Sequence, residues 1–261
     1  MDKKVLLFNH GRCGSKSIQF ILSKVLHEAD NDIKAGKGGK QYFDYSHYPG
    51  NILNLLDGGI IETLDRFYRE NGKASTFRHR FQDPCEILSY DTDDPVIKFV
   101  NESVIDYFSK KGYVIFLERK NLLKVAISYF ISNNFDISDS PPGSVEGFDT
   151  KNAHFGKIRN RCERLKREME YFKGYIQEKD TSMYNLYYQD FFLNSKKKTY
   201  RKVKHILNFL GCEPELNSLQ KKIIDEHTRK SEKVNSKKTY QLIENLDELN
   251  SKLGEKYGYL I

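Results

Sequence analysis

The chain has 261 residues, of which 43 are lysine or arginine and 36 are aspartate or glutamate, so its formal net charge is +7. This length is enough for one large α/β domain with a hydrophobic core. The positive charge favours an anionic ligand or partner but does not identify it. The basic residues are spread along the chain and no zinc-finger or RNP-type motif occurs, so we expect no nucleic-acid partner.

The cysteines and the apolar segments exclude further classes of protein. The four cysteines are far apart and form no C-x-x-C pair, which argues against a zinc site and favours reduced thiols in a cytoplasmic protein. No segment approaches the roughly 18 apolar residues of a membrane span, so we expect no transmembrane segment. We see no internal repeat and no Pro/Ser linker, and we expect one domain over residues 1–261.

Residues 3–26, KKVLLFNHGRCGSKSIQFILSKVL, predict a strand, a tight turn and a helix. The short apolar run at residues 5–8 is typical of a strand that is buried on both faces of a parallel sheet. Glycines at 11 and 14 favour a turn. Apolar residues at 18, 21, 22, 25 and 26 follow the period of a helix, for which Ser15 is a plausible N-cap.

A helix that begins directly after a glycine-rich turn binds anions well, because its first N–H groups lack intrahelical partners and its dipole is positive there. Arg12 and Lys16 add positive charge to this turn, residues 9–17, which we call the cradle. The alternative is an ordinary strand-turn-helix with two solvated basic residues. The cradle does not fit G-x-x-x-x-G-K-[ST], the pattern of nucleoside triphosphatases, because Asn9 stands where that pattern requires its first glycine.

The segments that follow predict a loop, a helix, a strand and a helix. The loop, residues 31–50, contains Asp44 and His47 among aromatic residues, which suggests either an acceptor pocket or a surface loop anchored by its rings. Residues 52–71 and 95–111 predict helices, and 73–81 predicts a strand. Because α/β sheets place ligands at the carboxyl ends of their strands, His79 is a candidate general base; the alternative is a structural histidine.

A second clear strand-turn-helix pattern occurs at residues 112–131, GYVIFLERKNLLKVAISYFI. They predict a buried strand that ends at Glu118-Arg119 and a helix that begins near Asn121. Arg119 and Ser128 can converge on one anion, with the arginine as a forked donor and the serine as a neutral one. The alternative is an arginine that forms a salt bridge.

The remaining segments complete an α/β pattern. Residues 133–151 predict a long polar loop, 154–177 a charged helix, 182–188 a strand, and 200–211 a helix with Gly211 as its C-cap. A last helix follows a basic loop. We therefore expect an α/β fold with a central parallel sheet of four or five strands and helices on both faces.

Four motifs in this order resemble those of the sulfotransferases that use 3′-phosphoadenosine 5′-phosphosulfate (PAPS). HGRCGSKS resembles the 5′-phosphosulfate loop and VIFLERKNLLKVAISYF the 3′-phosphate motif. NLYYQDFFLNSKKKTYRKVKHILNFLG resembles the Y-E-D-L segment and the helix that ends in F-L-G. SEKVNSKKTYQLIENLDEL resembles the C-terminal loop and helix of bacterial carbohydrate sulfotransferases, including nodulation-factor types.

The resemblance implies a P-loop-like three-layer domain and specific roles for residues. It implies that Arg119 and Ser128 hold a 3′-phosphate and that Lys230 or Lys233 closes over the nucleotide. The residues implied to hold the 5′-phosphosulfate are Arg12, Cys13, Gly14, Ser15, Lys16 and Ser17.

Three positions depart from the family pattern. Cys13 replaces the Ser or Thr often seen after the loop arginine, and Gln189 replaces the usual Glu of Y-E-D. The step from Arg119 to Ser128 is nine residues, against eight in many relatives.

Sulfuryl transfer resembles phosphoryl transfer in its in-line attack and its loose transition state. Lys16 is then suited to neutralise the leaving oxygen, and the base is His79, His47 or Asp44 in that order. We expect no metal, and an acceptor hydroxyl on a carbohydrate or glycolipid, met at the membrane surface if it is lipid-linked. Two other functions stay open: a small-molecule kinase with a divergent P-loop, in which Glu118 holds Mg²⁺, and a non-catalytic nucleotide or polyanion binder.

Overall fold

The computed structural model describes residues 4–29, 60–62, 64–65, 76–82, 94–135, 148–228 and 237–260. The chain divides into two compact units. Unit 1 consists of Met1–Glu118 and Tyr171–His227, and unit 2 consists of Arg119–Glu170 and Thr228–Ile261. The prediction of one domain over residues 1–261 is not tested by this division and stays a prediction.

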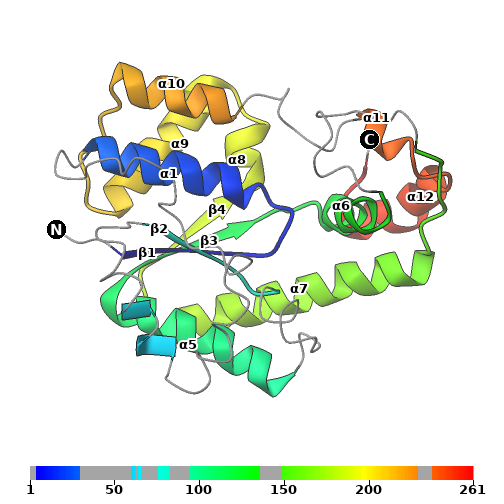
Figure 1. Ribbon diagram of the computed structural model, residues 1–261, viewed down its shortest axis with the longest axis horizontal. Coiled ribbons are helices and arrows are strands. Elements are labelled where there is room, and N and C mark those ends of the chain that lie inside the picture. Colours follow the sequence, from blue (N-terminus) through cyan, green and yellow to red (C-terminus); the bar gives the residue numbers. More distant parts are fainter. Residues whose placement is uncertain are drawn as a thin grey trace. The chain divides into compact units, whose positions relative to one another are not determined.

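A four-stranded parallel sheet forms the centre of unit 1 (Figure 1). Its strand order is β2-β1-β3-β4, and all three pairings are parallel. Val5, Leu6, Leu7 and Phe8 of β1 are completely buried, as expected for a strand covered on both faces. The expected α/β fold with a parallel sheet is confirmed. The strands are β1 (Lys4–Asn9), β2 (Thr76–Arg80), β3 (Gly112–Glu118) and β4 (Met183–Tyr187).

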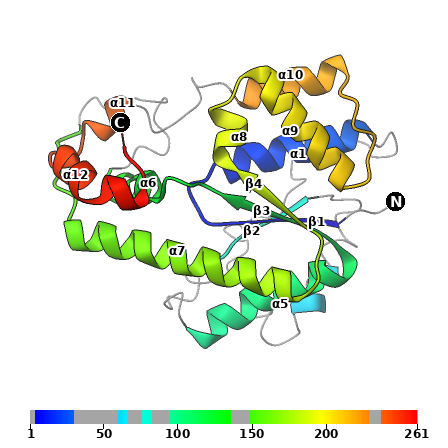
Figure 2. The ribbon, with the colours of Figure 1, turned by 180° about the vertical axis from the view of Figure 1, so that it is seen from behind.

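Helices cover both faces of this sheet (Figures 1 and 2). One face carries α1 (Ser15–Ala29), α8 (Tyr188–Phe192), α9 (Lys196–Phe209) and α10 (Ser218–His227). The other face carries α5 (Pro95–Lys111) and the end of α7 (Phe155–Glu178), a helix that contributes residues to both units. Leu7 belongs to the core on the α1 face, whereas on the other face Phe8 stacks on Phe116 and makes an edge contact with Phe172.

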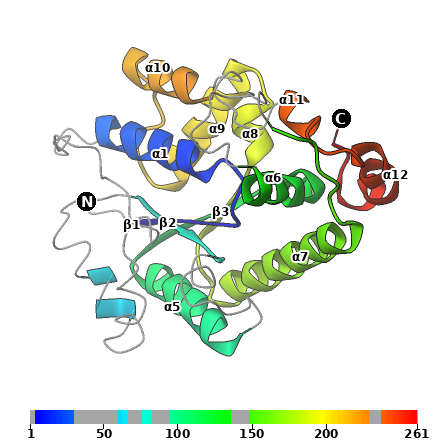
Figure 3. The same ribbon diagram turned by 45° about the vertical axis from the view of Figure 1, so that its right-hand side comes forward.

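Unit 2 contains α6 (Leu122–Asn134), α11 (Lys237–Tyr240), α12 (Leu246–Tyr257) and the first part of α7 (Figure 3). Asn121 caps α6: its side chain accepts a hydrogen bond from the Lys124 amide at 2.7 Å. The Asn121 side-chain amide also donates to the carbonyl of Tyr259 at 2.6 Å. The start of α6 is thus tied to the C-terminal segment of the chain within the same unit.

Several element boundaries differ from the sequence-based expectations. The helix expected over 200–211 begins at Lys196, and α10 was not expected. Gly211 follows α9 with a φ of 62°, as a C-terminal glycine should. The helix expected over 52–71 lies mostly outside the described residues. Part of the long loop expected over 133–151 is helical, because α6 continues to Asn134, and residues 136–147 lie outside the described part.

Candidate functional site

The cradle in unit 1 begins where β1 ends at Asn9 and leads directly into α1. The Ile18 amide donates to the carbonyl of Gly14 at 3.1 Å, so Gly14 and not Ser15 is the N-cap of α1. The backbone N–H groups of the next three residues therefore start the helix without intrahelical acceptors. Together with the positive end of the helix dipole, they form an arrangement that attracts anions.

Two residues of the turn have left-handed backbone conformations. Arg12 has a φ of 62° and Gly14 has a φ of 75°. Gly14 has a second reason to be glycine, because a Cβ at this position would lie 2.6 Å from Cε2 of Phe192 and 3.2 Å from Cδ2 of Tyr188. The turn therefore packs closely on α8, whose Tyr188 and Phe192 rings stack with centroids 4.6 Å apart.

Hydrogen bonds from neighbouring segments fix the backbone of the turn. The Gly11 amide donates to Oε1 of Gln82 at 2.9 Å, and the Phe81 amide donates to the carbonyl of Asn9 at 3.1 Å. Both contacts come from the end of β2, which pairs with β1. Gln82 was not among the residues expected from the sequence, because its role depends on the pairing of two strands about 70 positions apart along the chain.

Arg78 is a second residue that sequence reasoning missed. It lies on β2 opposite Leu7, is only 3% exposed, and places Nη1 3.4 Å from Oγ of Ser15, the first residue of α1. A guanidinium is therefore buried next to the helix start that the cradle exposes. The period of two in β2 could have found it, because Thr76, Arg78 and Arg80 share one face.

The cradle residues differ in their accessibility. Arg12 and Lys16 are exposed, whereas Cys13 is completely buried. The Cys13 thiol donates to the carbonyl of His10 at 2.8 Å, as a small residue inside a tight turn would. Ser15 is buried beside Arg78, and Ser17 is half-buried. The charged side chains that an incoming anion would meet are thus those of Arg12 and Lys16.

His79, the first candidate for the general base, lies in the core. It alternates with Arg78 along β2 and points to the opposite face of the sheet, where it stacks on Phe8 with a centroid distance of 5.4 Å. It is completely buried, and its Nε2 lies 2.5 Å from Oδ1 of Asn101 on α5. Burial lowers the pKa of His79 to about 4. This environment is that of a structural histidine, and its role as base stays a prediction that the geometry disfavours.

Four other predicted site residues lie outside the described residues. They are the two remaining candidates for the base and the two lysines of the basic C-terminal loop: Asp44, His47, Lys230 and Lys233.

A second basic cluster belongs to unit 2 and consists of Arg119, Lys124, Ser128 and Tyr240; we call it the Arg119 cluster. The Arg119 side chain donates a hydrogen bond to the hydroxyl of Tyr240. Burial raises the pKa of Tyr240, and the charge of Arg119 opposes this shift. Burial also lowers the pKa of Lys124, with a further contribution from the positive charge of Arg119.

Burial is the larger cause of the lowered pKa of Lys124, and the smaller contribution from Arg119 reflects a second cation near the start of α6. Ser128 follows Lys124 by one helical turn and is only 4% exposed. Sequence reasoning named Arg119 and Ser128 but not Tyr240, which α11 supplies from more than 100 residues further along the chain. An anion bound beside Arg119 would relieve the repulsion between the two cations.

The described residues contain neither a group of metal ligands nor a membrane-spanning helix. No three His, Cys, Asp or Glu side chains gather there as a set of metal ligands. No described helix is long and apolar enough to cross a bilayer. Glu118, the carboxylate considered for Mg²⁺ binding, forms an ion pair with Lys173 at 2.7 Å.

Comparisons of the chain with models of protein families and with curated proteins found no match. The function is therefore inferred from the cradle, the Arg119 cluster and the order of the sequence motifs.

Proposed function

We propose that this protein is a sulfotransferase with a P-loop-like fold, which transfers a sulfuryl group from PAPS to an acceptor hydroxyl. The observation that carries the proposal is the cradle: a left-handed turn, a helix start, two exposed cations and a buried guanidinium, all at the carboxyl end of β1. This is the end of a parallel sheet at which α/β proteins bind their ligands.

The cradle is suited to the 5′ end of the donor. The first N–H groups of α1 can hold the oxygens of the transferred group. Gly14 allows the turn that precedes them to pack against Phe192 of α8, which a Cβ would prevent. Arg12, on the turn, and Lys16, on the first turn of α1, can neutralise charge that develops on the leaving oxygen. Arg78 would contribute a further positive charge through its position beside Ser15.

The Arg119 cluster is suited to the 3′-phosphate. Arg119 directly follows Glu118, the last residue of β3. A phosphate is bound well by a guanidinium fork together with a hydroxyl donor. Arg119 and Ser128 offer these two groups, and Lys124 and Tyr240 complete the cluster.

The general base is the least constrained part of the proposal. Because His79 is buried on the α5 face, we favour His47 or Asp44, which follow α1 in the sequence. A base that removes the proton of the acceptor hydroxyl contributes about 10²–10⁴-fold to the rate. A carbohydrate or glycolipid acceptor is proposed from the C-terminal resemblance alone.

The kinase alternative has less support. It needs a carboxylate that is available to hold Mg²⁺, but Lys173 pairs with Glu118 at 2.7 Å. It also needs the G-x-x-x-x-G-K pattern, which the cradle lacks.

Calorimetric titration separates the three functions. We would titrate 3′-phosphoadenosine 5′-phosphate, the nucleotide product, and compare it with adenosine diphosphate and with ATP plus Mg²⁺. We expect preferential binding of the 3′-phosphorylated nucleotide without any metal. Preference for ATP with Mg²⁺ would replace the proposal with the kinase, and binding of none of the three would show that the cradle is only a turn. Turnover of PAPS that is lost in Lys16→Ala would then distinguish the enzyme from a non-catalytic binder.

A further inference from the structure

Helix α9 has an outward face that is rich in unpaired cations. Its buried residues, Thr199, Val203, Ile206 and Leu207, lie on one side. At 100° per residue, the exposed residues of α9 other than its first residue, Lys196, fall within about 100° on the opposite side. These residues are Lys197, Lys198, Arg201, His205 and Asn208.

The cations of α9 fall into two groups. Lys196, Lys202 and Lys204 are held by carboxylates of the fold: Asp225 at 2.6 Å, Asp190 at 3.1 Å and Glu215 at 3.0 Å. Among the residues that the structure describes, Lys197, Lys198 and Arg201 have no such ion pair. Carboxylates of the same chain thus neutralise the first three cations. The other three can interact with a separate partner.

The position of these lysines is unfavourable for the helix itself. Lys196, Lys197 and Lys198 occupy the first turn of α9, which contains no acidic residue. Cations are disfavoured there because the helix dipole is positive at its N-terminus. Asp225 compensates Lys196, whereas Lys197 and Lys198 have no ion pair among the residues that the structure describes. Cations that are unfavourable for the helix and lack such compensation are expected where a surface has a function.

An apolar side chain accompanies this charge. Leu193, three residues before α9, is 60% exposed. An exposed leucine gains nothing from phosphate or sulfate groups, but it gains from insertion between lipid chains. We name Leu193, Lys197, Lys198, Arg201 and His205 together the α9 ridge.

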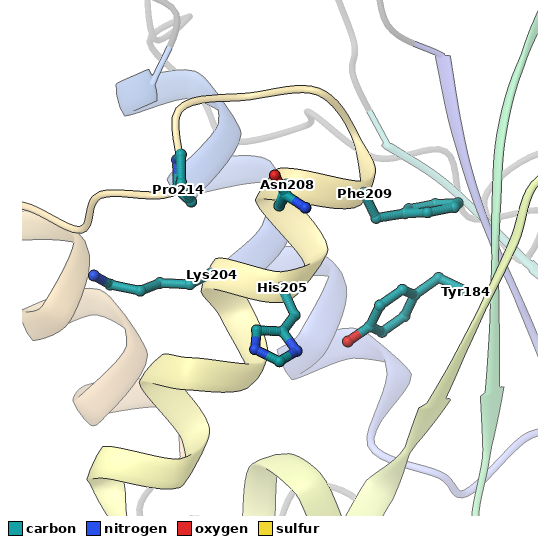
Figure 4. Close-up of a pocket in the computed structure, with 6 residues that line it drawn as sticks. All are labelled: Tyr184, Lys204, His205, Asn208, Phe209 and Pro214. Carbon is teal, nitrogen blue, oxygen red and sulfur yellow. The ribbon is translucent and has the colours of Figure 1, made fainter.

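The α9 ridge continues into a pocket of about 560 Å³. His205 belongs to both, and Figure 4 shows its ring pointing toward Tyr184 of β4, next to the ring of Phe209. Tyr184 and Phe209 are only partly buried, with their centroids 5.4 Å apart. Aromatic side chains favour the level of the lipid headgroups, so this pocket extends the same surface. It is lined by Tyr184, Lys204, His205, Asn208, Phe209 and Pro214.

We propose that the α9 ridge docks the protein on the surface of an anionic lipid bilayer. Three exposed cations on one side of α9 provide the attraction to the lipid phosphates, and Leu193 provides a shallow anchor. The inference does not depend on the proposed nucleotide chemistry, because it uses none of the residues of the cradle or the Arg119 cluster.

Vesicle sedimentation tests the proposal with the full chain. The vesicles are phosphatidylcholine alone and phosphatidylcholine with about one third phosphatidylglycerol. We expect partitioning onto the anionic vesicles only, and weaker partitioning as salt is raised, because salt screens exposed charges. Each surface cation contributes roughly fivefold, so the triple variant Lys197→Glu, Lys198→Glu, Arg201→Glu should lower partitioning by roughly 100-fold or more.

A matched control reverses three exposed cations on another helix. Lys157→Glu, Arg159→Glu and Lys166→Glu on α7 make the same change in net charge and should lower partitioning by less than roughly threefold. The neutral triple variant Lys197→Gln, Lys198→Gln, Arg201→Gln removes the same three cations without adding carboxylates, so it should also bind the anionic vesicles more weakly than the parent protein. Circular dichroism of each variant checks that its helix content is unchanged, which separates lost binding from misfolding. Equal losses in both charge-reversal variants would overturn the α9 ridge as the docking surface.

Leu193→Ala distinguishes a bilayer from other polyanions. It should lower vesicle binding roughly fivefold, through the lost apolar contact, and leave any binding to a short DNA duplex unchanged. Binding to the DNA duplex that requires the three cations, with no preference for anionic vesicles, would overturn the proposal and point to a nucleic-acid partner.

Discussion

At position 14 both the backbone conformation and the packing of the cradle require glycine. Its φ of 75° lies in the region that favours glycine, and a Cβ there would lie 2.6 Å from Cε2 of Phe192. We predict that Gly14→Ala destabilises the protein and weakens anion binding together, because the same turn supports both.

The size of the effect follows from two terms. A left-handed conformation costs a non-glycine residue about 1–2 kcal/mol. The Cβ would approach Phe192 0.8 Å closer than the 3.4 Å at which ordinary contact begins (3.4 minus 2.6). Phe192 is 7% exposed and stacks on Tyr188, so its rigid ring has little room to move. Overpacking of this kind costs about 1–3 kcal/mol. The free energy of unfolding should therefore fall by about 2–5 kcal/mol.

Urea unfolding measures this change, and a second glycine provides the control. Gly174 lies inside α7, and a Cβ there would have no heavy atom within 4 Å. Gly174→Ala should therefore raise the free energy of unfolding by about 0.5–1 kcal/mol, since glycine is unfavourable inside a helix. The two substitutions add the same methyl group and should act in opposite directions. A change of less than about 0.5 kcal/mol in Gly14→Ala would refute both the backbone and the packing argument.

Three further predictions concern residues of β2 and of the turn that follows it. The pKa of His79 is lowered to about 4 by burial, so the folded protein binds fewer protons than the unfolded chain between that value and the ordinary value of 6.5. The contribution of His79 to stability should fall by about 2–3 kcal/mol from pH 8 to pH 4.5, and urea unfolding at both pH values should show this loss in the parent protein and not in His79→Gln. Gln82→Leu leaves the Gly11 amide without its acceptor and should lower the free energy of unfolding by about 1–3 kcal/mol, which the same assay measures; an unchanged midpoint would show that the bond is dispensable. Arg78→Met should weaken binding of 3′-phosphoadenosine 5′-phosphate by roughly 10–100-fold in calorimetry, and unchanged affinity would assign Arg78 to packing alone.

Local sequence signals predicted the elements that carry the cradle. The apolar run at residues 5–8 and the helical period after it correspond to β1 and α1, and Asn121 was expected where it caps α6. These features depend on neighbours within a few residues along the chain, so periodicity and turn chemistry are sufficient to find them.

The contacts that complete the two sites depend on segments far apart in the sequence. Alternation along β2 separates Arg78 from His79, but only the contact of Arg78 with Ser15 of α1 and the stacking of His79 on Phe8 show which of them lies on the α1 face. The packing of Gly14 on Phe192 joins residues 178 positions apart, and Tyr240 reaches Arg119 from α11. No local pattern encodes such pairings, which is why the sequence could not show that His79 lies on the sheet face opposite to that of Arg78.

The central claim of the proposed function is that the chain binds a 3′-phosphorylated nucleotide and that both Lys16 and Arg119 contribute to its affinity. A calorimetric cycle tests it most directly, with 3′-phosphoadenosine 5′-phosphate and adenosine 5′-phosphate titrated into the parent protein, Arg119→Ala and Lys16→Ala. Arg119→Ala should abolish the preference for the 3′-phosphate, a loss of roughly 10–100-fold, and leave the affinity for adenosine 5′-phosphate unchanged. Lys16→Ala should weaken both nucleotides by the same factor. If Arg119→Ala instead weakens both nucleotides equally, the Arg119 cluster is not the 3′-phosphate site and the proposed function is contradicted.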